Sequence, residues 1–141
     1  MTQDYYGTKR ITAWRQDKDG EHGYAVKYSD GYTSWSPAAA FKAAYQPIHS
    51  MSFGHAIAAL KDGQRVARAG WNGKGMFLVL VPGSAKIEPR EGTPYAHLSV
   101  SPYGVVDINP HIDMKTATGE MQPGWLASQT DMLADDWTIV D

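Results

Sequence analysis

The sequence predicts an α+β fold that consists mostly of antiparallel β-sheet with two or three short helices. Short runs in which polar and apolar residues alternate recur along the chain, and glycine or proline bounds most of them. Only a few segments carry apolar residues at helical spacing. The 141 residues include five tryptophans, eight tyrosines and three phenylalanines. Aromatic side chains are enriched in strands, so this composition also favours a β-rich fold.

The overall composition excludes several classes of protein. The formal net charge of −2 offers no general attraction to a nucleic-acid polymer or to an anionic membrane. No apolar run approaches the roughly 20 residues needed to cross a bilayer, and the N-terminus lacks a basic-then-apolar signal pattern. Because cysteine is absent, disulfides, thiolate metal sites and cysteine nucleophiles are excluded. We therefore expect a soluble cytosolic protein with no cofactor and no bound metal.

The first third of the chain is predicted to form a small β-meander. Asp30-Gly31 is a strong hairpin signal between two of its strands. The predicted strands cover residues 8–15, 24–28 and 32–35.

A helix is predicted to follow this meander over residues 38–45. Ser36 supplies a hydroxyl N-cap and Pro37 would occupy the first helical position, a combination typical of a helix start. A proline shortly after the helix ends it and marks the best boundary in the chain. We therefore predict an N-terminal module over 1–49 and an α+β domain over 50–141.

The predicted α+β domain begins with a helix over residues 53–62. Ser52 can cap this helix, and Gly63 ends it. A second short helix is predicted over 129–134, with Ser128 as its cap. Residues 83–94 are predicted to be a mobile, charged loop. The predicted strands cover residues 64–69, 76–81, 95–100, 105–109, 111–116 and 137–140, and the second of these is predicted to be buried.

A glycine-rich loop over residues 69–75 is the strongest candidate for a binding site. Trp71, Asn72 and Lys74 there would suit a ligand with an aromatic base and a negatively charged group. The loop fails as a phosphate-binding P-loop, because no Ser or Thr follows the lysine and a strand follows where a helix is needed. The alternative is that Trp71 packs on the core and the loop is only a turn.

Alternation along residues 111–116 places three charged or titratable side chains on one strand face. His111, Asp113 and Lys115 could form a metal half-site or an acid–base pair. No other histidine or carboxylate lies at a recognisable ligand spacing, so an ion-paired, solvent-facing strand is the alternative.

A second candidate stretch pairs an aromatic residue with polar groups at the start of the helix predicted over 129–134. Trp125 precedes Ser128, Thr130 and Asp131, where backbone N–H groups would favour an anion. A plain N-cap explains the same residues. No nucleophile elbow surrounds any serine, so a catalytic triad is not expected.

From residue 51 onward the sequence resembles the second Thoeris anti-defence family of phage proteins. The stretches that carry the resemblance are MSFGHAIAALKDGQRVARAGWNGKGMFLVLVPG (51–83), PHIDMKTATGEMQPGWLASQTDMLADDW (110–137) and the closing TIV. The resemblance implies a non-enzymatic sponge in the cytoplasm of the infected bacterial host. It also implies a homotetramer that holds cyclic ADP-ribose isomers intact in pockets between protomers. For some members it extends to cyclic dinucleotides, the signals of CBASS immunity, at a separate site.

The resemblance also implies roles for residues within the matching stretches. Trp71 would stack on the adenine, with Asn72 and Lys74 near the ribose and phosphate. Gly124, which precedes Trp125, and the long loop over 83–94 depart from the simplest family pattern. The remaining residues expected to line the ligand site are Met76, Phe77, Asp113, Lys115, Trp125, Thr130 and Asp131, with His111 as a further candidate.

Two other classes of function remain open from the sequence. A small phage hydrolase could cleave a cyclic nucleotide signal with Asp113 and His111. A phage structural or host-interaction protein could instead use the aromatic-rich block over residues 1–49 to bind another protein.

Overall fold

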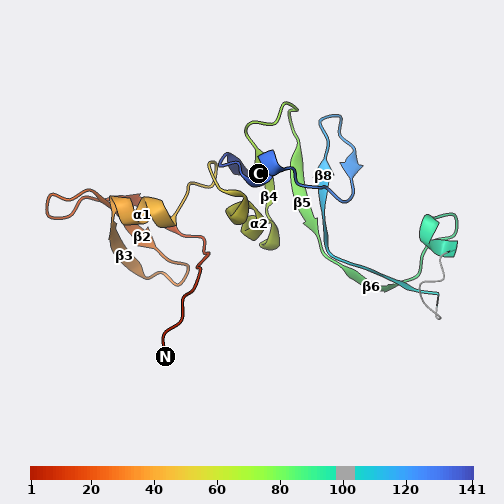
Figure 1. Cartoon of the computed structure of the whole chain (residues 1–141), viewed down its shortest axis with the longest axis horizontal. Coiled ribbons are helices and arrows are strands. Elements are labelled where there is room, and N and C mark those ends of the chain that lie inside the picture. The colour runs from red at the N-terminus through yellow and green to blue at the C-terminus, as the bar shows by residue number, and fades with distance from the viewer. Residues whose placement is uncertain (98–103) are drawn as a thin grey trace.

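The computed structural model describes residues 1–97 and 104–141, which form two groups of strands and helices (Figure 1). The first group contains β1, β2, β3 and α1, and it lies to one side of the second group in Figure 1. All the described strand pairs are antiparallel, and the helices are short. This arrangement confirms the predicted α+β fold. The division into modules of 1–49 and 50–141 stays a prediction.

The first group is a three-stranded sheet with one helix on it. The strands pair in the order β1 (Thr12–Arg15), β2 (Gly23–Lys27), β3 (Thr33–Pro37). The ring of Tyr24 stacks on Phe41 of α1 (Ala38–Ala44), with 4.1 Å between the ring centroids. Tyr45 extends this stack at 5.1 Å from Phe41. The predicted strands are therefore present, although the first begins at residue 12 rather than at residue 8.

The predicted cap of α1 is wrong. Ser36 lies in β3 and pairs with Tyr24, so Pro37 takes the N-cap position and no side chain caps the helix. The Ser36 hydroxyl donates instead to the carbonyl of Pro37 at 3.3 Å. Sheet pairing extends two residues beyond the predicted strand and takes the serine away from the helix start.

The second group is built on a five-stranded antiparallel sheet. The strand order is β10-β4-β5-β8-β9. The loop from β4 to β5, the end of β8 and the start of β10 all lie at the same end of this sheet. The bounds of its strands are β4 (Arg65–Arg68), β5 (Phe77–Val81), β8 (His111–Lys115), β9 (Met121–Gln122) and β10 (Trp137–Val140).

Helix α2 (Phe53–Lys61) covers one face of this sheet and forms the core with it. Ser52 caps the helix by accepting a hydrogen bond from the His55 backbone N–H at 3.3 Å, as predicted. Gly63 follows the helix with a φ of 84°, a conformation that glycine adopts without strain. The buried side chains of the core are Met51, Ala56, Ala59, Leu60, Val66, Leu78 and Trp137.

The other face of the five-stranded sheet carries a different set of side chains. Leu78 and Leu80 of β5 point toward α2, and the other three residues of the strand point away. Of the five residues in β5 only Leu78 is buried, so the prediction of a fully buried strand is wrong. The helices cover one face of the sheet, which leaves Phe77, Val79 and Val81 half-buried on the other. We call this second surface the open face.

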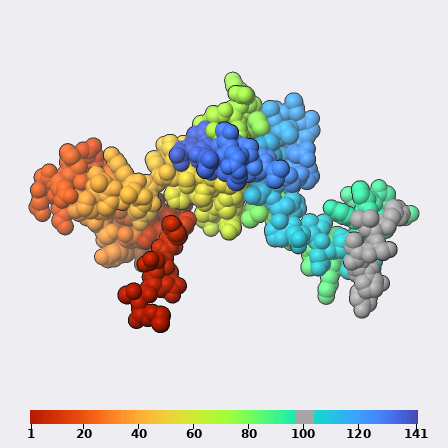
Figure 2. Space-filling model, viewed as in Figure 1, coloured from red at the N-terminus to blue at the C-terminus, as the bar shows by residue number. Residues whose placement is uncertain are grey.

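A two-stranded ribbon projects from the five-stranded sheet (Figures 1 and 2). β6 (Ser84–Ile87) pairs with β7 (Val106–Ile108), where the sequence predicted a charged loop over 83–94. Every residue of β6 is exposed, so the strand lacks the apolar alternation by which strands are recognised. Its pairing includes a hydrogen bond from the Lys86 backbone N–H to the Asp107 carboxylate at 2.8 Å.

The predicted strand over 95–100 is wrong in its first half. A 3₁₀ helix, η1 (Pro94–His97), takes this place, and the remaining predicted residues lie outside the described part of the chain. The predicted strand over 105–109 is present as β7. Helix α3 (Gln129–Met132) begins at the predicted cap but ends two residues early.

The segment that joins the two groups is attached to the edge strand β10. Met51 and Trp137 exchange backbone hydrogen bonds of 2.7 and 3.1 Å, and the Ile139 N–H donates to the Ile48 carbonyl at 2.9 Å. These bonds extend the sheet beyond β10 and place residues 48–51 with the second group. Among residues 1–97 and 104–141, no helix is both long and apolar enough to cross a bilayer.

Candidate functional site

Three tryptophans from separate parts of the chain meet on the α2 side of the sheet. The rings of Trp71 and Trp125 stand edge-on to Trp137, with centroids 5.4 and 6.1 Å away, and lie 6.4 Å from each other. Phe53 of α2 completes the cluster, 5.3 Å from Trp137 and 6.3 Å from Trp125. Trp137 is fully buried, whereas Trp71 and Trp125 are half-buried and keep part of each ring at the surface.

Asp131 ties the aromatic cluster to a charged network. Its Oδ1 atom accepts a hydrogen bond from Trp71 Nε1 at 3.1 Å and another from Arg68 Nη1 at 2.8 Å. Its backbone carbonyl accepts from Trp137 Nε1 at 2.9 Å. Ser128 caps α3 by accepting from the Asp131 N–H at 3.1 Å, so the plain N-cap alternative describes the backbone correctly.

Arg68 lies between two carboxylates. Its Nε atom donates to Asp136 Oδ1 at 2.8 Å, and Asp136 Oδ2 accepts from the Gly70 N–H at the same distance. The Arg68 and Asp131 side chains are each only 15% exposed, so water screens this pair less than an ion pair on the surface. The network therefore fixes the start of the glycine-rich loop to α3 and to the residue before β10.

The network shifts the pKa values of all three ionised groups toward their charged forms. Hydrogen bonds with Asp136 and Asp131 raise the pKa of Arg68. The hydrogen bond from Arg68 is the main cause that lowers the pKa of Asp136. Burial acts to raise the pKa of Asp131, but hydrogen bonds from Arg68, Trp71 and Ser128 together outweigh it and lower the pKa. Both carboxylates are therefore ionised at neutral pH and serve as fixed acceptors.

The glycine-rich loop is closely packed in its middle and exposed at its polar residues. A Cβ atom on Gly73 would lie 2.5 Å from the sulfur of Met76 and 2.7 Å from the Cβ of Ala117. Asn72 and Lys74 on either side of it are exposed. The loop therefore needs glycine at residue 73, and it presents one amide and one cation to solvent.

On the open face, two cations flank one aromatic ring. The Arg65 guanidinium carbon lies 4.9 Å from the centroid of Phe77, and Lys115 Nζ lies 5.4 Å from it. Lys115 Nζ also donates to the carbonyl of Gly75 at 3.2 Å. This bond attaches the glycine-rich loop to the open face. The combination of aromatic and cationic groups suits a planar ligand that carries negative charge.

His111 and Asp113 lie on the same open face but at its other end. His111 Nε2 is 3.5 Å from Asp113 Oδ1, and that oxygen accepts from the Gly124 N–H at 3.0 Å. His111 Nδ1 contacts the Asn109 carbonyl at 2.8 Å. The Trp125 N–H, next in the chain after Gly124, donates to the Ile112 carbonyl at 2.7 Å. Asp113 therefore holds the turn that delivers Trp125 to the aromatic cluster.

The residues singled out in the sequence fall on two sides of the sheet. Trp71, Trp125 and Asp131 meet on the α2 side, whereas Phe77, Asp113 and Lys115 lie on the open face. Thr130 is exposed on α3, and Met76 is half-buried beside Gly73. The glycine-rich loop, at the end of the sheet, joins the two sides. A ligand that contacted both sets would have to lie at that end.

Sequence reasoning missed the charged residues that hold this arrangement together. Arg68 follows Val66 by two residues, which places it on the core face of β4, where a cation needs acid partners. That spacing is the sequence signal that could have identified Arg68 as a buried cation with acidic partners. Nothing in the sequence marked Arg65 as a neighbour of Phe77, because sheet pairing across an eight-residue loop decides that contact. In the described part of the chain, no group of three or more His, Asp or Glu side chains is placed to hold a metal ion.

The second group of strands and helices matches a known protein family. The family model Tad2-like, described as the Thoeris anti-defense 2-like domain, matches residues 51–140. A protein of Bacillus phage SP01 named Thoeris anti-defense 2 is 40% identical over 90 residues, which cover 64% of this chain and 94% of that protein. The match spans both sides of the five-stranded sheet and leaves out β1, β2, β3 and α1.

Proposed function

The chain belongs to the Tad2-like family of Thoeris anti-defence proteins, and on this premise we propose that it binds a cyclic ADP-ribose isomer and holds it intact. Its role is in defeating the Thoeris defence of a bacterial host. By sequestering the signal in the host cytoplasm, it would keep the defence effector inactive. The observation that carries this proposal is the identity to the phage protein, which extends over nearly all of that protein's length.

The proposed binding region is the end of the sheet at which the glycine-rich loop lies. Asn72 and Lys74 are exposed there, and the Phe77 ring with its two flanking cations is adjacent. Lys115 connects the two parts through its bond to the Gly75 carbonyl. Stacking of a base on an aromatic ring contributes about 1–3 kcal/mol, and charge-assisted bonds to a diphosphate add to this. The exposed part of the Trp71 ring is a second surface for stacking.

Sequestration without cleavage agrees with the state of the acidic residues. Asp131 and Asp136 are ionised and hydrogen-bonded within the Arg68 network, so neither has a proton to donate at neutral pH. Asp113 already accepts a hydrogen bond from the Gly124 backbone. These carboxylates hold the loop and the aromatic cluster in place through their hydrogen bonds. General acid–base chemistry would require them to gain and lose protons, which would break those bonds.

We further propose that the chain acts as a homotetramer with ligand pockets between protomers. Nanomolar capture requires about 12 kcal/mol of binding free energy, which favours a ligand that is enclosed rather than laid on one surface. The open face offers half-buried apolar side chains that no helix in the described part of the chain covers. A second protomer on the open face would enclose the end of the sheet at which the glycine-rich loop lies. Sedimentation equilibrium of the full chain tests the assembly, and a monomer at micromolar concentration would refute it.

Calorimetric titration with purified cyclic ADP-ribose isomers tests the binding proposal. The complex is then denatured by heat, and the released ligand is analysed by chromatography. Tight binding with unchanged ligand recovered is the expected result. Absence of binding to every isomer would refute the proposal. Recovery of cleaved ligand would favour a hydrolase, for which the contact between His111 and Asp113 is the specific structural support.

Charge-removing variants locate the site. Lys74→Ala and Lys115→Ala should each weaken binding by about tenfold or more, because a hydrogen bond to a charged group contributes about 1.5–3 kcal/mol. Lys61→Ala is the matched control, since Lys61 is an exposed lysine in the last turn of α2. Equal affinities for all three variants would place the ligand elsewhere. Trp71→Ala is a poorer probe, because Trp71 also bonds Asp131 and packs on the core.

A further inference from the structure

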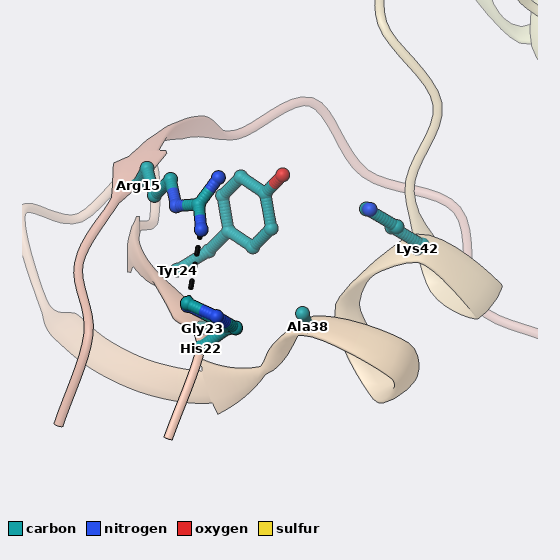
Figure 3. Close-up of a pocket in the computed structure, with 6 residues that line it drawn as sticks. All are labelled: Arg15, His22, Gly23, Tyr24, Ala38 and Lys42. Atoms are coloured by element: carbon teal, nitrogen blue, oxygen red, sulfur yellow. Dashed lines mark hydrogen bonds between the residues drawn. The ribbon is translucent and has the colours of Figure 1, made fainter. Parts of the chain in front are cut away.

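The N-terminal sheet lies outside the family match and carries a cavity of its own. The cavity lies between the end of β1, the start of β2 and one side of α1, and its volume is about 170 Å³ (Figure 3). The cavity is open to solvent, since the Arg15 and His22 side chains that line it are 66% and 69% exposed, and its volume would hold several water molecules. The residues that line it are Arg15, His22, Gly23, Tyr24, Ala38 and Lys42.

The polar side chains of this cavity are basic. Figure 3 shows Arg15 and His22 on one side of the Tyr24 ring and Lys42 on the other. Arg15 Nη2 lies 3.0 Å from His22 Nδ1, the same nitrogen that lies 3.1 Å from Asp17 Oδ1. This nitrogen can accept from the guanidinium or donate to the carboxylate, but not both at once. The remaining guanidinium donors and the Lys42 ammonium stay available to a ligand. No carboxylate lines the cavity.

The walls of the cavity are held by well-paired backbone and packed rings. Arg15 pairs with Tyr24 across β1 and β2, and the next N–H in the chain, that of Gln16, donates to the Gly23 carbonyl at 2.9 Å. Tyr24 is fixed by its stack on Phe41. A binding group whose backbone is fixed in this way loses less conformational freedom when a ligand arrives.

One acidic side chain competes for the same cations from outside the lining. Asp17 Oδ1 lies 3.1 Å from His22 Nδ1 and 3.8 Å from Arg15 Nε. The contact with His22 is the main cause that lowers the pKa of Asp17, so this carboxylate is ionised at neutral pH. Arg15, Lys42 and Asp17 together contribute a net charge of +1 at the cavity. An anion that enters the cavity would therefore have to displace only one exposed carboxylate, that of Asp17, from Arg15.

We propose that this cavity is a second binding site, separate from the signal-binding region, and that it takes the phosphoryl group of a small molecule. A guanidinium fork matches the geometry of two phosphate oxygens, and the Lys42 ammonium supplies a second positive charge at the same cavity. A doubly charged phosphoryl group gains from both cations, whereas a singly charged carboxylate gains less. Free phosphate and a phosphate monoester share this chemistry.

The test is an NMR titration of the isotope-labelled full chain with inorganic phosphate and, separately, with ribose 5-phosphate. Saturable shifts of the Arg15, Tyr24 and Lys42 amides are expected with at least one ligand. The ligand that binds more tightly shows whether the site takes free phosphate or a phosphate monoester. Unsaturable or absent shifts of these amides with both ligands would overturn the proposal.

Three substitutions distinguish a site from general attraction. Lys42→Gln and Arg15→Gln should each weaken binding by about tenfold or more, because each removes a hydrogen bond to a charged group. Asp17→Asn should tighten binding by about two- to fivefold, since it removes the competitor. Lys27→Gln, an exposed cation on the same sheet, is the matched control. If Lys27→Gln weakens binding as much as Lys42→Gln, the proposal is refuted.

Discussion

Replacing Asp131 with asparagine tests whether the charged network holds the glycine-rich loop in place. The substitution keeps the size of the side chain and removes its charge. In the native protein one oxygen of Asp131 accepts from Arg68 Nη1 at 2.8 Å and from Trp71 Nε1 at 3.1 Å. The Asp131 and Arg68 side chains are each 15% exposed, so water replaces these bonds poorly.

The expected loss of stability follows from these contacts. Breaking a fully buried ion pair by removing one partner costs about 3–5 kcal/mol. Arg68 keeps Asp136 as a partner, and a hydrogen bond to a charged group contributes about 1.5–3 kcal/mol. We therefore expect Asp131→Asn to lower the free energy of unfolding by about 2 kcal/mol, which corresponds to a fall in Tm of about 4–8 °C for a chain of this size.

Urea unfolding followed by tryptophan fluorescence measures this loss directly. Asp135→Asn is the matched control, because it removes the same charge from an exposed residue of the same segment. The control should change stability by less than about 0.5 kcal/mol. Equal values for the two variants would refute the structural role of Asp131.

Two further predictions concern pH and the base of the ribbon. Because the pKa values of Asp131 and Asp136 are lowered in the folded state, their contribution to stability is complete above about pH 5. It is lost as the pH falls from the ordinary aspartate pKa of about 3.9 through the lower pKa values of the folded state. An acid titration of Asp131→Asn should show a smaller loss than wild type, and an identical loss would contradict the pKa shifts. Gly83→Ala should destabilise the protein by about 1–3 kcal/mol, because its new Cβ would lie 2.8 Å from the Ile108 carbonyl oxygen. Hydrogen exchange of the β6 amides should accelerate in this variant and not in Gly7→Ala, whose Cβ has no neighbour within 4 Å.

The dual role of Trp71 affects how any binding data should be interpreted. Its indole N–H donates to Asp131 and its ring stands edge-on to Trp137, yet part of the ring remains at the surface. The two interpretations that the sequence left open, core packing and ligand stacking, therefore apply to different parts of one side chain. Trp71→Phe keeps an aromatic ring but removes the N–H and makes the ring system smaller, so it separates the two better than truncation to alanine.

The amino-acid sequence by itself determined those elements whose signals are local. The Ser52 cap, Gly63 after the helix, the alternation over residues 111–116 and the apolar segment of β10 each depend on neighbours a few residues apart. The resemblance carried by the stretches from residue 51 onward likewise identified the family that the comparisons show.

The tertiary structure decided what depends on residues distant in the chain. The β6 strand has no apolar alternation, and only its pairing with β7, about 20 residues later, makes it a strand. The ion pairs of Arg68 with Asp131 and Asp136 span more than 60 residues, and the flanking of Phe77 by Arg65 and Lys115 depends on strand register. Periodicity assigns a side chain to a face, but the partners it meets there are set by how the strands pair and which face the helices cover.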